Sequence, residues 1–139
     1  MPRAFEILEH PADIGFRAFG RSRQELFENA ALALFSLACD PATIEEQESR
    51  EVEATGSDDE ALIYSWLAEL LAVAEAERLV FRRAVIRALE SGRVRGTAHG
   101  EAFDRNRHRS GTNIKAVTFH QLKVAKTQDG FSAQVFLDL

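Results

Sequence analysis

The sequence has 139 residues, a formal net charge of −5 and a hydrophobic content of 45%. This length is enough for one domain with its own core, and we expect a single domain over residues 1–139. The N-terminus lacks the apolar run of a signal peptide, and no segment has the ~18 uncharged apolar residues of a membrane span. We therefore expect a cytoplasmic protein with no membrane partner. Cys39 is the only cysteine, which excludes an internal disulfide and a multi-thiolate zinc site.

The charge is unevenly distributed. Residues 1–77 hold 5 basic and 17 acidic side chains, whereas residues 78–109 hold nine arginines and three acidic side chains. Such an arginine-rich segment could bind RNA or an acidic protein surface. Alternating arginines on a hairpin are more often its solvated face, which is the interpretation we favour. An RNA-binding module that uses residues 78–109 stays as the alternative. The hairpin arginines are Arg82, Arg83, Arg87, Arg93 and Arg95.

The first half of the chain predicts three strands and two helices. Period-two alternation predicts strands over 5–8, 15–19 and 50–54. A capping-box sequence beginning at Ser22 and an apolar stripe predict a helix over 23–38. The stripe consists of Leu26, Phe27, Ala30, Ala31, Leu34 and Ala38.

A second capping box, beginning at Ser57, predicts a helix over 58–76. Its apolar stripe consists of Ile63, Trp66, Leu67, Leu70, Leu71 and Ala74. Because Trp66 lies within this stripe, we expect it to anchor the core.

The second half of the chain predicts two hairpins. Residues 79–90 and 93–103 flank a two-residue turn, and residues 113–127 and 131–138 flank an Asp-Gly turn. Between the hairpins, residues 104–111 are expected to form an exposed loop. The predicted order is β-β-α-β-α-β-β-β-β, which indicates an α+β fold with two helices packed on a mainly antiparallel sheet.

The segment 114–122 combines strong β-propensity with a lysine and a histidine. Strand periodicity sends Ile114, Ala116, Thr118 and His120 to one face and Lys115, Val117, Phe119 and Gln121 to the other. A lysine beside apolar residues either extends to solvent at the strand end or is held for an anionic partner.

The familiar catalytic and cofactor motifs are missing. The sequence has no phosphate-binding GxxxxGK, no GxGxxG before a helix, and no GxSxG, HExxH or CxxC. The four histidines lack the spacing of zinc ligands. His120 is a candidate functional residue, although a strand histidine is more often structural.

Two aspartates occupy noteworthy positions. Asp13 lies in a proline-started turn before a strand, and Asp138 is the penultimate residue of a sequence whose last strand is apolar to its end. That ending indicates a docked C-terminus. If Asp13 lies beside it, the two carboxylates and the terminal oxygens of Leu139 would form an all-oxygen cluster that suits Ca²⁺ or Mg²⁺. Such a cluster needs a cation or a lysine, such as Lys115, close by. Ordinary turn and terminus roles for the two aspartates stay open.

Four segments, taken in order, resemble the archease family. They are His10–Gly15, the helix segment Asp59–Leu71, the segment Ile114–Leu122 and the ending Phe136–Leu139. The resemblance covers essentially the whole chain. It implies a small α+β protein that is itself no enzyme and serves as a protein cofactor of the RtcB-type RNA ligase in tRNA splicing or RNA repair.

The resemblance also implies roles for individual residues. Asp13, Asp138 and the Leu139 terminus match the family's metal site, for which Ca²⁺ is expected, with Mg²⁺ or Mn²⁺ as alternatives. Lys115 matches the functional lysine, and His10 and His120 match motif positions. On this resemblance, the protein would present its acidic metal site to the ligase active site, promote formation of the ligase's covalent histidine–GMP intermediate and allow multiple turnovers.

The chain departs from the family pattern at two positions. Asn113 stands where an acid is common, and Phe119 stands where tyrosine is usual. The first change removes a possible secondary metal or ion-pair contact, and the second removes only a hydroxyl. A metal-dependent hydrolase built on Asp13, Asp138 and His120 is a further alternative.

Overall fold

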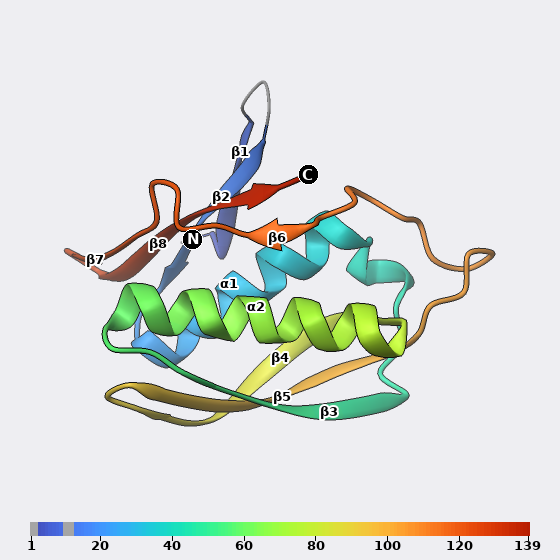
Figure 1. Cartoon of the computed structure of the whole chain (residues 1–139), viewed down its shortest axis with the longest axis horizontal. Helices are drawn as coiled ribbons and strands as arrows, with labels where there is room; N and C mark the ends of the chain where they lie inside the picture. The colour runs from blue at the N-terminus through green and yellow to red at the C-terminus, as the bar shows by residue number, and fades with distance from the viewer. Residues whose placement is uncertain (1–2, 10–12) are drawn as a thin grey trace.

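The computed structural model describes residues 3–9 and 13–139. Figure 1 shows how its helices and strands are arranged. The elements are β1 (Phe5–Glu9), β2 (Ile14–Gly20), α1 (Arg23–Ala38), the 3-10 turn η1 (Pro41–Thr43), β3 (Glu48–Thr55), α2 (Asp59–Glu77), β4 (Leu79–Glu90), β5 (Arg93–Ala102), β6 (Ala116–Val117), β7 (Lys123–Thr127) and β8 (Gly130–Asp138). Within the described ranges, neither helix has the length and hydrophobicity needed to cross a membrane.

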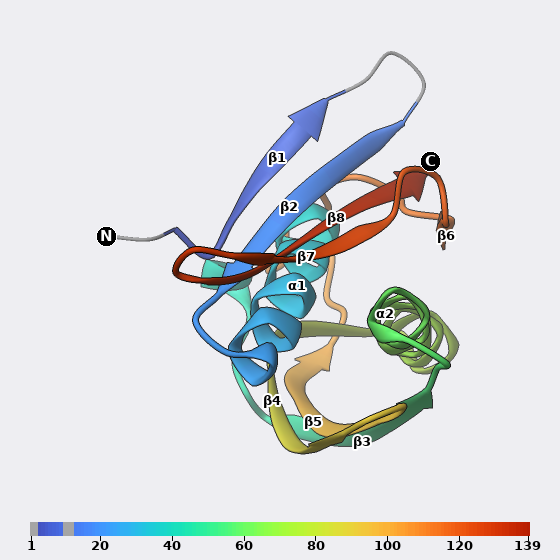
Figure 2. The ribbon, with the colours of Figure 1, turned by 90° about the vertical axis from the view of Figure 1, so that its left-hand side faces the viewer.

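The strands form two antiparallel sheets with both helices between them (Figure 2). One sheet has the order β1-β2-β8-β6, with β7 also paired to β8, and the other has the order β3-β5-β4. The α+β class is confirmed. The strands, however, do not form one sheet with helices on one face, because each sheet contributes one wall of a shared core.

Helix α1 is buried on nearly all sides. It begins at Arg23 and ends at Ala38, as the capping box predicts. Ser22 Oγ accepts a hydrogen bond from the Glu25 N–H at 3.1 Å, and the Glu25 carboxylate accepts one from the Arg21 N–H at 3.0 Å. Ala33 and Phe35, one on each flank of the predicted stripe, are also buried. Such a wide buried surface is expected for a helix that two sheets enclose.

Helix α2 lies beside α1 and begins one residue later than the cap at Ser57 predicts. Asp58, not Ser57, caps it, because the Asp58 carboxylate accepts a hydrogen bond from the Ala61 N–H at 2.8 Å. Trp66 is fully buried, as expected, and its indole N–H donates to the Phe27 carbonyl at 3.1 Å. The tryptophan therefore joins the two helices through both packing and a hydrogen bond.

Each helix also satisfies one strand N–H with a carboxylate. Glu28 of α1 accepts from the Ile86 N–H on β4, and Glu60 of α2 accepts from the Val124 N–H on β7, both at 2.9 Å. Strands at a sheet edge leave such groups unpaired and prone to pair with other chains. These two contacts use side chains to complete backbone hydrogen bonding that the sheets leave open.

The hairpin β4–β5 carries its arginines on an exposed face, as expected. Arg83 pairs with Glu46 at 2.8 Å, Arg93 pairs with Glu53, and Arg95 lies 3.6 Å from Glu51. The glutamates belong to β3 or to the segment that precedes it. The acidic first half of the chain therefore neutralises much of the arginine-rich segment within one sheet face.

The segment 104–111 is not the simple exposed loop that its composition predicts. His108 is buried, and its Nε2 lies 2.9 Å from the buried carboxylate of Glu101. The Asp104 N–H donates to His108 Nδ1 at 2.8 Å, so Nδ1 carries no proton and Nε2–H is the donor to Glu101. The Glu101 carboxylate also accepts from the Glu45 N–H and from Arg107. The loop is thereby fastened to β5.

The same segment is docked against the end of α1. The Gly111 N–H donates to the Ala38 carbonyl at 3.0 Å, and the Thr112 N–H donates to the Leu37 carbonyl at 2.8 Å. These bonds use carbonyls that the last turn of a helix leaves free. They fix the path of the chain into Lys115 and β6.

Replacing Glu101 with Gln should weaken the fold and reduce its sensitivity to acid. The Glu45 N–H, His108 and Arg107 lower the pKa of the Glu101 carboxyl to about 2. Because the pKa of Glu101 is lower in the folded state than its unfolded value near 4.5, the ionised carboxylate stabilises the protein fully at pH values above 4.5. This contribution is lost as the pH falls from 4.5 toward 2. At pH 7 we expect Glu101→Gln to cost about 2 kcal/mol, the scale of hydrogen bonds to a charged group. Urea unfolding at pH 7, 4 and 3 measures both effects, and an unchanged pH profile in the variant would contradict the assignment.

Replacing Gly96 with Ala should destabilise the protein strongly. A Cβ at Gly96 would lie 2.7 Å from the ring of Trp66 and 2.8 Å from the Val85 carbonyl oxygen. Because both neighbours are packed, we expect a loss of about 2–3 kcal/mol, which thermal and urea unfolding would detect. A variant with wild-type stability would show that the sheet and α2 can separate at this point without cost.

Candidate functional site

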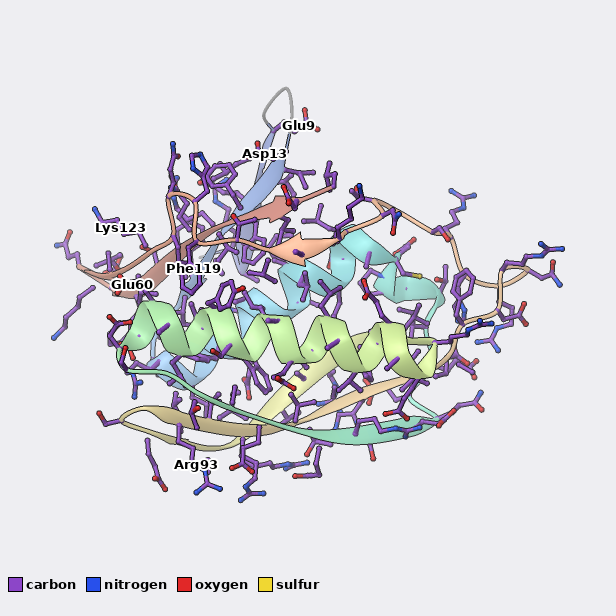
Figure 3. All side chains as sticks on the ribbon, in the orientation of Figure 1. Glu9, Asp13, Glu60, Arg93, Phe119 and Lys123 are labelled. Carbon is purple, nitrogen blue, oxygen red and sulfur yellow. The ribbon has the colours of Figure 1, made fainter. Side chains whose placement is uncertain are left out.

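The register of the five-stranded sheet brings Asp13 and Asp138 together. Strand β2 pairs with β8 so that Ile14 is opposite Leu137. Asp13 precedes Ile14 and Asp138 follows Leu137, so the two aspartates occupy opposite positions across the two strands. Residues directly opposite in an antiparallel pair have Cβ atoms about 5 Å apart. Asp13 is half-buried and Asp138 is exposed, at the end where the β1–β2 hairpin projects (Figures 1 and 3).

On its other side, β8 brings Lys115 and Leu139 to the same end. Ala116 of β6 is opposite Asp138, which places Lys115 opposite Leu139. The Lys115 N–H donates to the Asp138 carbonyl at 2.8 Å, while its side chain is exposed. Asp13, Asp138, Lys115 and Leu139 therefore meet at one end of the sheet, and we call this group the tip.

The prediction of one continuous strand over residues 113–127 is wrong. Only Ala116–Val117 and Lys123–Thr127 form strands, and both pair with β8. Between these strands, the five residues 118–122 stand opposite only Val135 and Phe136, so the extra residues loop out. Gln121 has a φ of 51°, which marks a turn that strand periodicity does not reveal.

This turn changes the faces that the sequence pattern predicts. Phe119 does not share the buried side of Val117, because 61% of its surface is exposed. Its ring stacks on Tyr64 of α2, with centroids 3.9 Å apart and planes 18° apart. His120 is also exposed, and its ring meets the edge of Phe136 at 5.9 Å. His120 therefore lies on the turn beside the tip, through its contact with Phe136.

Phe136 and Gly15 support the outer side of the tip. Phe136 lies two residues before Asp138, and thus on the same face of β8, and is only 2% exposed. Gly15 is opposite it, and a Cβ there would lie 2.6 Å from the Phe136 ring. The glycine thus makes room for a ring that packs beneath the acidic positions. Sequence reasoning missed this pair, although a glycine beside Ile14 in a strand is the usual signal of close packing.

The chemistry of the tip is that of oxygen ligands and one primary amine. Two carboxylates at opposite strand positions, with the carboxylate of Leu139, form a donor set that suits a hard divalent cation. Within residues 3–9 and 13–139, no group of three or more His, Cys, Asp or Glu side chains could hold a metal ion. A cation here therefore needs the Leu139 carboxylate, backbone carbonyls or water in addition to the aspartates. His10 lies outside the described residues.

The family comparison agrees with this arrangement of elements. The model of the Archease protein family matches residues 5–139. The protein archease of Methanosarcina barkeri is 41% identical, over 99% of this chain and 97% of its own. The solution structure of Methanobacterium thermoautotrophicum protein 1598 is 38% identical, with a TM-score of 0.83 over 98% of this chain and 99% of that one.

A second solved structure shares the fold at lower similarity. The crystal structure of an archease from Thermotoga maritima, described as a possible chaperone, has a TM-score of 0.66 and is 24% identical, over 95% of this chain and 94% of that one. The family match and the 41% identity to Methanosarcina barkeri archease both extend over nearly the whole sequence. This chain belongs to the archease family.

Proposed function

We propose that this chain activates an RtcB-type RNA ligase as a protein cofactor and catalyses no reaction by itself. It promotes guanylylation of the ligase and its repeated turnover in tRNA splicing or RNA repair, in the cytoplasm. The observation that carries the proposal is the register of β8, which gathers Asp13, Asp138, Lys115 and Leu139 from three separate parts of the chain. These are the residues that the family resemblance marks as functional.

The tip is suited to act on phosphate groups within another protein. A divalent cation held by Asp13, Asp138 and the Leu139 carboxylate, most simply Ca²⁺, would offset the negative charge that develops during guanylyl transfer. The Lys115 ammonium can contribute to the same charge stabilisation. Both groups stand at an end of the sheet, where they can enter a partner's active site. His120, on the turn beside the tip, is proposed to assist, as is His10, which lies outside the described residues.

Removing either Asp138 or Lys115 should abolish activation while leaving the fold intact. Both side chains are exposed, so Asp138→Ala and Lys115→Ala remove little packing. We expect a loss of about a hundredfold in the stimulated rate of ligase guanylylation, the scale of one lost electrostatic contact in a transition state. The measurement is formation of the covalent ligase–GMP adduct with the cognate ligase, followed by RNA joining under multiple-turnover conditions.

Matched variants distinguish a specific role of the tip in ligase activation from a general effect of surface charge. Glu69→Ala and Arg82→Ala remove one acidic and one basic exposed side chain outside the tip, and both should activate like the wild type. Circular dichroism and thermal unfolding verify the fold of all four variants. Full activation by Asp138→Ala and Lys115→Ala would refute the proposed tip. Absence of activation by folded wild-type protein with an active ligase would refute the proposed function.

Calcium should stabilise the wild type but not the Asp138→Asn variant. A ligand that binds only the folded state adds about 2.7 kcal/mol at a concentration a hundred times its Kd. Asn keeps the shape of the side chain and one carbonyl oxygen but removes one of the few negative charges on which the affinity for a hard cation depends. Thermal unfolding with and without Ca²⁺, Mg²⁺ and Mn²⁺ measures the effect and identifies the preferred cation. An equal rise in Tm for the variant would exclude Asp138 as a ligand.

A further inference from the structure

A continuous part of the chain beside the tip carries positive charge that the fold leaves uncompensated. Residues 105–128 contain three arginines, three lysines and no acidic side chain. Arg107 is engaged with Glu101. The other five cations of this segment are exposed and form no ion pair with any residue in the described ranges: Arg105, Arg109, Lys115, Lys123 and Lys126. This concentration of free charge stands out in a protein whose net charge is −5.

Three arginines of the three-stranded sheet differ in this respect, whereas Arg82 and Arg87 of β4 are exposed and have no ion pair among the described residues. Arg83, Arg93 and Arg95 each lie within 4 Å of a glutamate carboxylate. Figure 3 places Arg93 on the side of the molecule opposite Phe119 and Lys123. A polyanion that displaced these glutamates would gain little net charge neutralisation. The free cations of residues 105–128 are therefore better suited to bind a polyanion than these three paired arginines are.

Three of the free cations follow the edge of the five-stranded sheet. The register with β8 places Lys126 opposite Phe131 and Lys115 opposite Leu139, with Lys123 between them. The eight residue-to-residue steps from Phe131 to Leu139 span about 26 Å at 3.3 Å per step. The lysines thus lie along one edge, with Lys123 and Lys126, three residues apart on β7, on opposite faces of the sheet. A line of backbone phosphates that contacts both must follow the edge itself.

Phe119 interrupts this path with an exposed aromatic ring. The ring stacks on Tyr64 and still exposes 61% of its surface, on the turn between β6 and β7. Nucleobases stack readily on exposed aromatic rings. Because Tyr64 already holds the ring in place, little side-chain entropy remains to be lost when a base binds.

We propose that Lys115, Phe119, Lys123 and Lys126, here named the lysine strip, bind single-stranded RNA. The lysine ammonium groups contact phosphates, and one base stacks on Phe119. An exposed ring among unpaired cations on one sheet edge fits a strand of alternating phosphates and bases better than an acidic protein face, which offers no such stacking partner. Lys115 belongs to both the tip and the strip, but RNA binding at the strip requires neither the ligase nor a cation at the tip and can be tested apart from the proposed function.

The test is fluorescence anisotropy of a labelled single-stranded RNA decamer with the full chain, in EDTA and without ligase. We expect micromolar to submillimolar affinity that falls with salt, with a slope of about −0.7 per phosphate neutralised, thus about −2 for three lysines. Lys123→Gln/Lys126→Gln should reduce the slope to about −0.7. Phe119→Ala should weaken binding about tenfold at unchanged slope, and Phe119→Tyr should restore it.

A charge-matched control distinguishes RNA binding at the lysine strip from a general effect of the protein's net charge. Arg93→Gln/Arg95→Gln removes the same two charges from the three-stranded sheet and should leave RNA affinity and salt slope unchanged. Equal losses in the two double variants would overturn the proposal, as would the absence of salt-dependent binding by folded wild-type protein. If polyglutamic acid binds as tightly as RNA and Phe119→Ala changes neither affinity, the strip is instead a surface for an acidic protein. Ligase activation, measured separately on Asp138→Ala, can fail or succeed independently of these outcomes.

Discussion

The last strand, β8, is the element on which the rest of the structure depends. It pairs with β2 along one edge and with β6 and β7 along the other. Its inward residues Ala133, Val135 and Leu137 are fully buried against the helices. Burying a Val or Leu side chain contributes about 1.5–3 kcal/mol, so the strand is fixed by packing as well as by two ladders of hydrogen bonds. Every residue of the tip obtains its position from this strand, either by lying on it or by pairing with it.

The pairing of β8 on both edges also explains how the sheet tolerates acidic side chains at its end. The core residues stop at Leu137, and Asp138 and Leu139 project beyond it. Opposed like charges destabilise a sheet, yet here they lie where the strand is already held by its earlier residues. The docked loop 104–112 adds a second constraint, because its bonds to α1 and Glu101 determine where Lys115 enters the sheet.

The local elements were largely predictable from the sequence, and the relations between elements were not. Helix α1, the first strands and the β4–β5 hairpin follow from caps, periodicity and a two-residue turn, all of which are local signals. The division into two sheets was missed, although Ala33 and Phe35, outside the predicted stripe of α1, carried the signal of a second packing face. The buried His108 was missed because its partner Glu101 belongs to a different element, and composition alone describes residues 104–111 as a loop.

The candidate site shows the same division. Asp13 and Asp138 could be singled out by their positions in the sequence. That they lie opposite each other across β2 and β8 depends on a strand register that no local pattern specifies. The broken strand 113–127 is the clearest failure, because β-propensity is high throughout and the positive φ falls at Gln121, which is neither Gly nor Asn. Strand periodicity beyond Thr118 therefore assigned Phe119 to the wrong environment.

This break has a physical consequence for the protein's surface. An uninterrupted edge strand from residue 113 to 127 would present a row of unpaired backbone groups, which invites pairing with other chains. The looped residues 118–122 divide that edge, Glu60 satisfies the Val124 N–H, and lysines flank both parts. The features that protect the edge from aggregation are the same ones that expose Phe119 between cations. A surface that repels other strands in this way is left free for a partner recognised through charge and stacking.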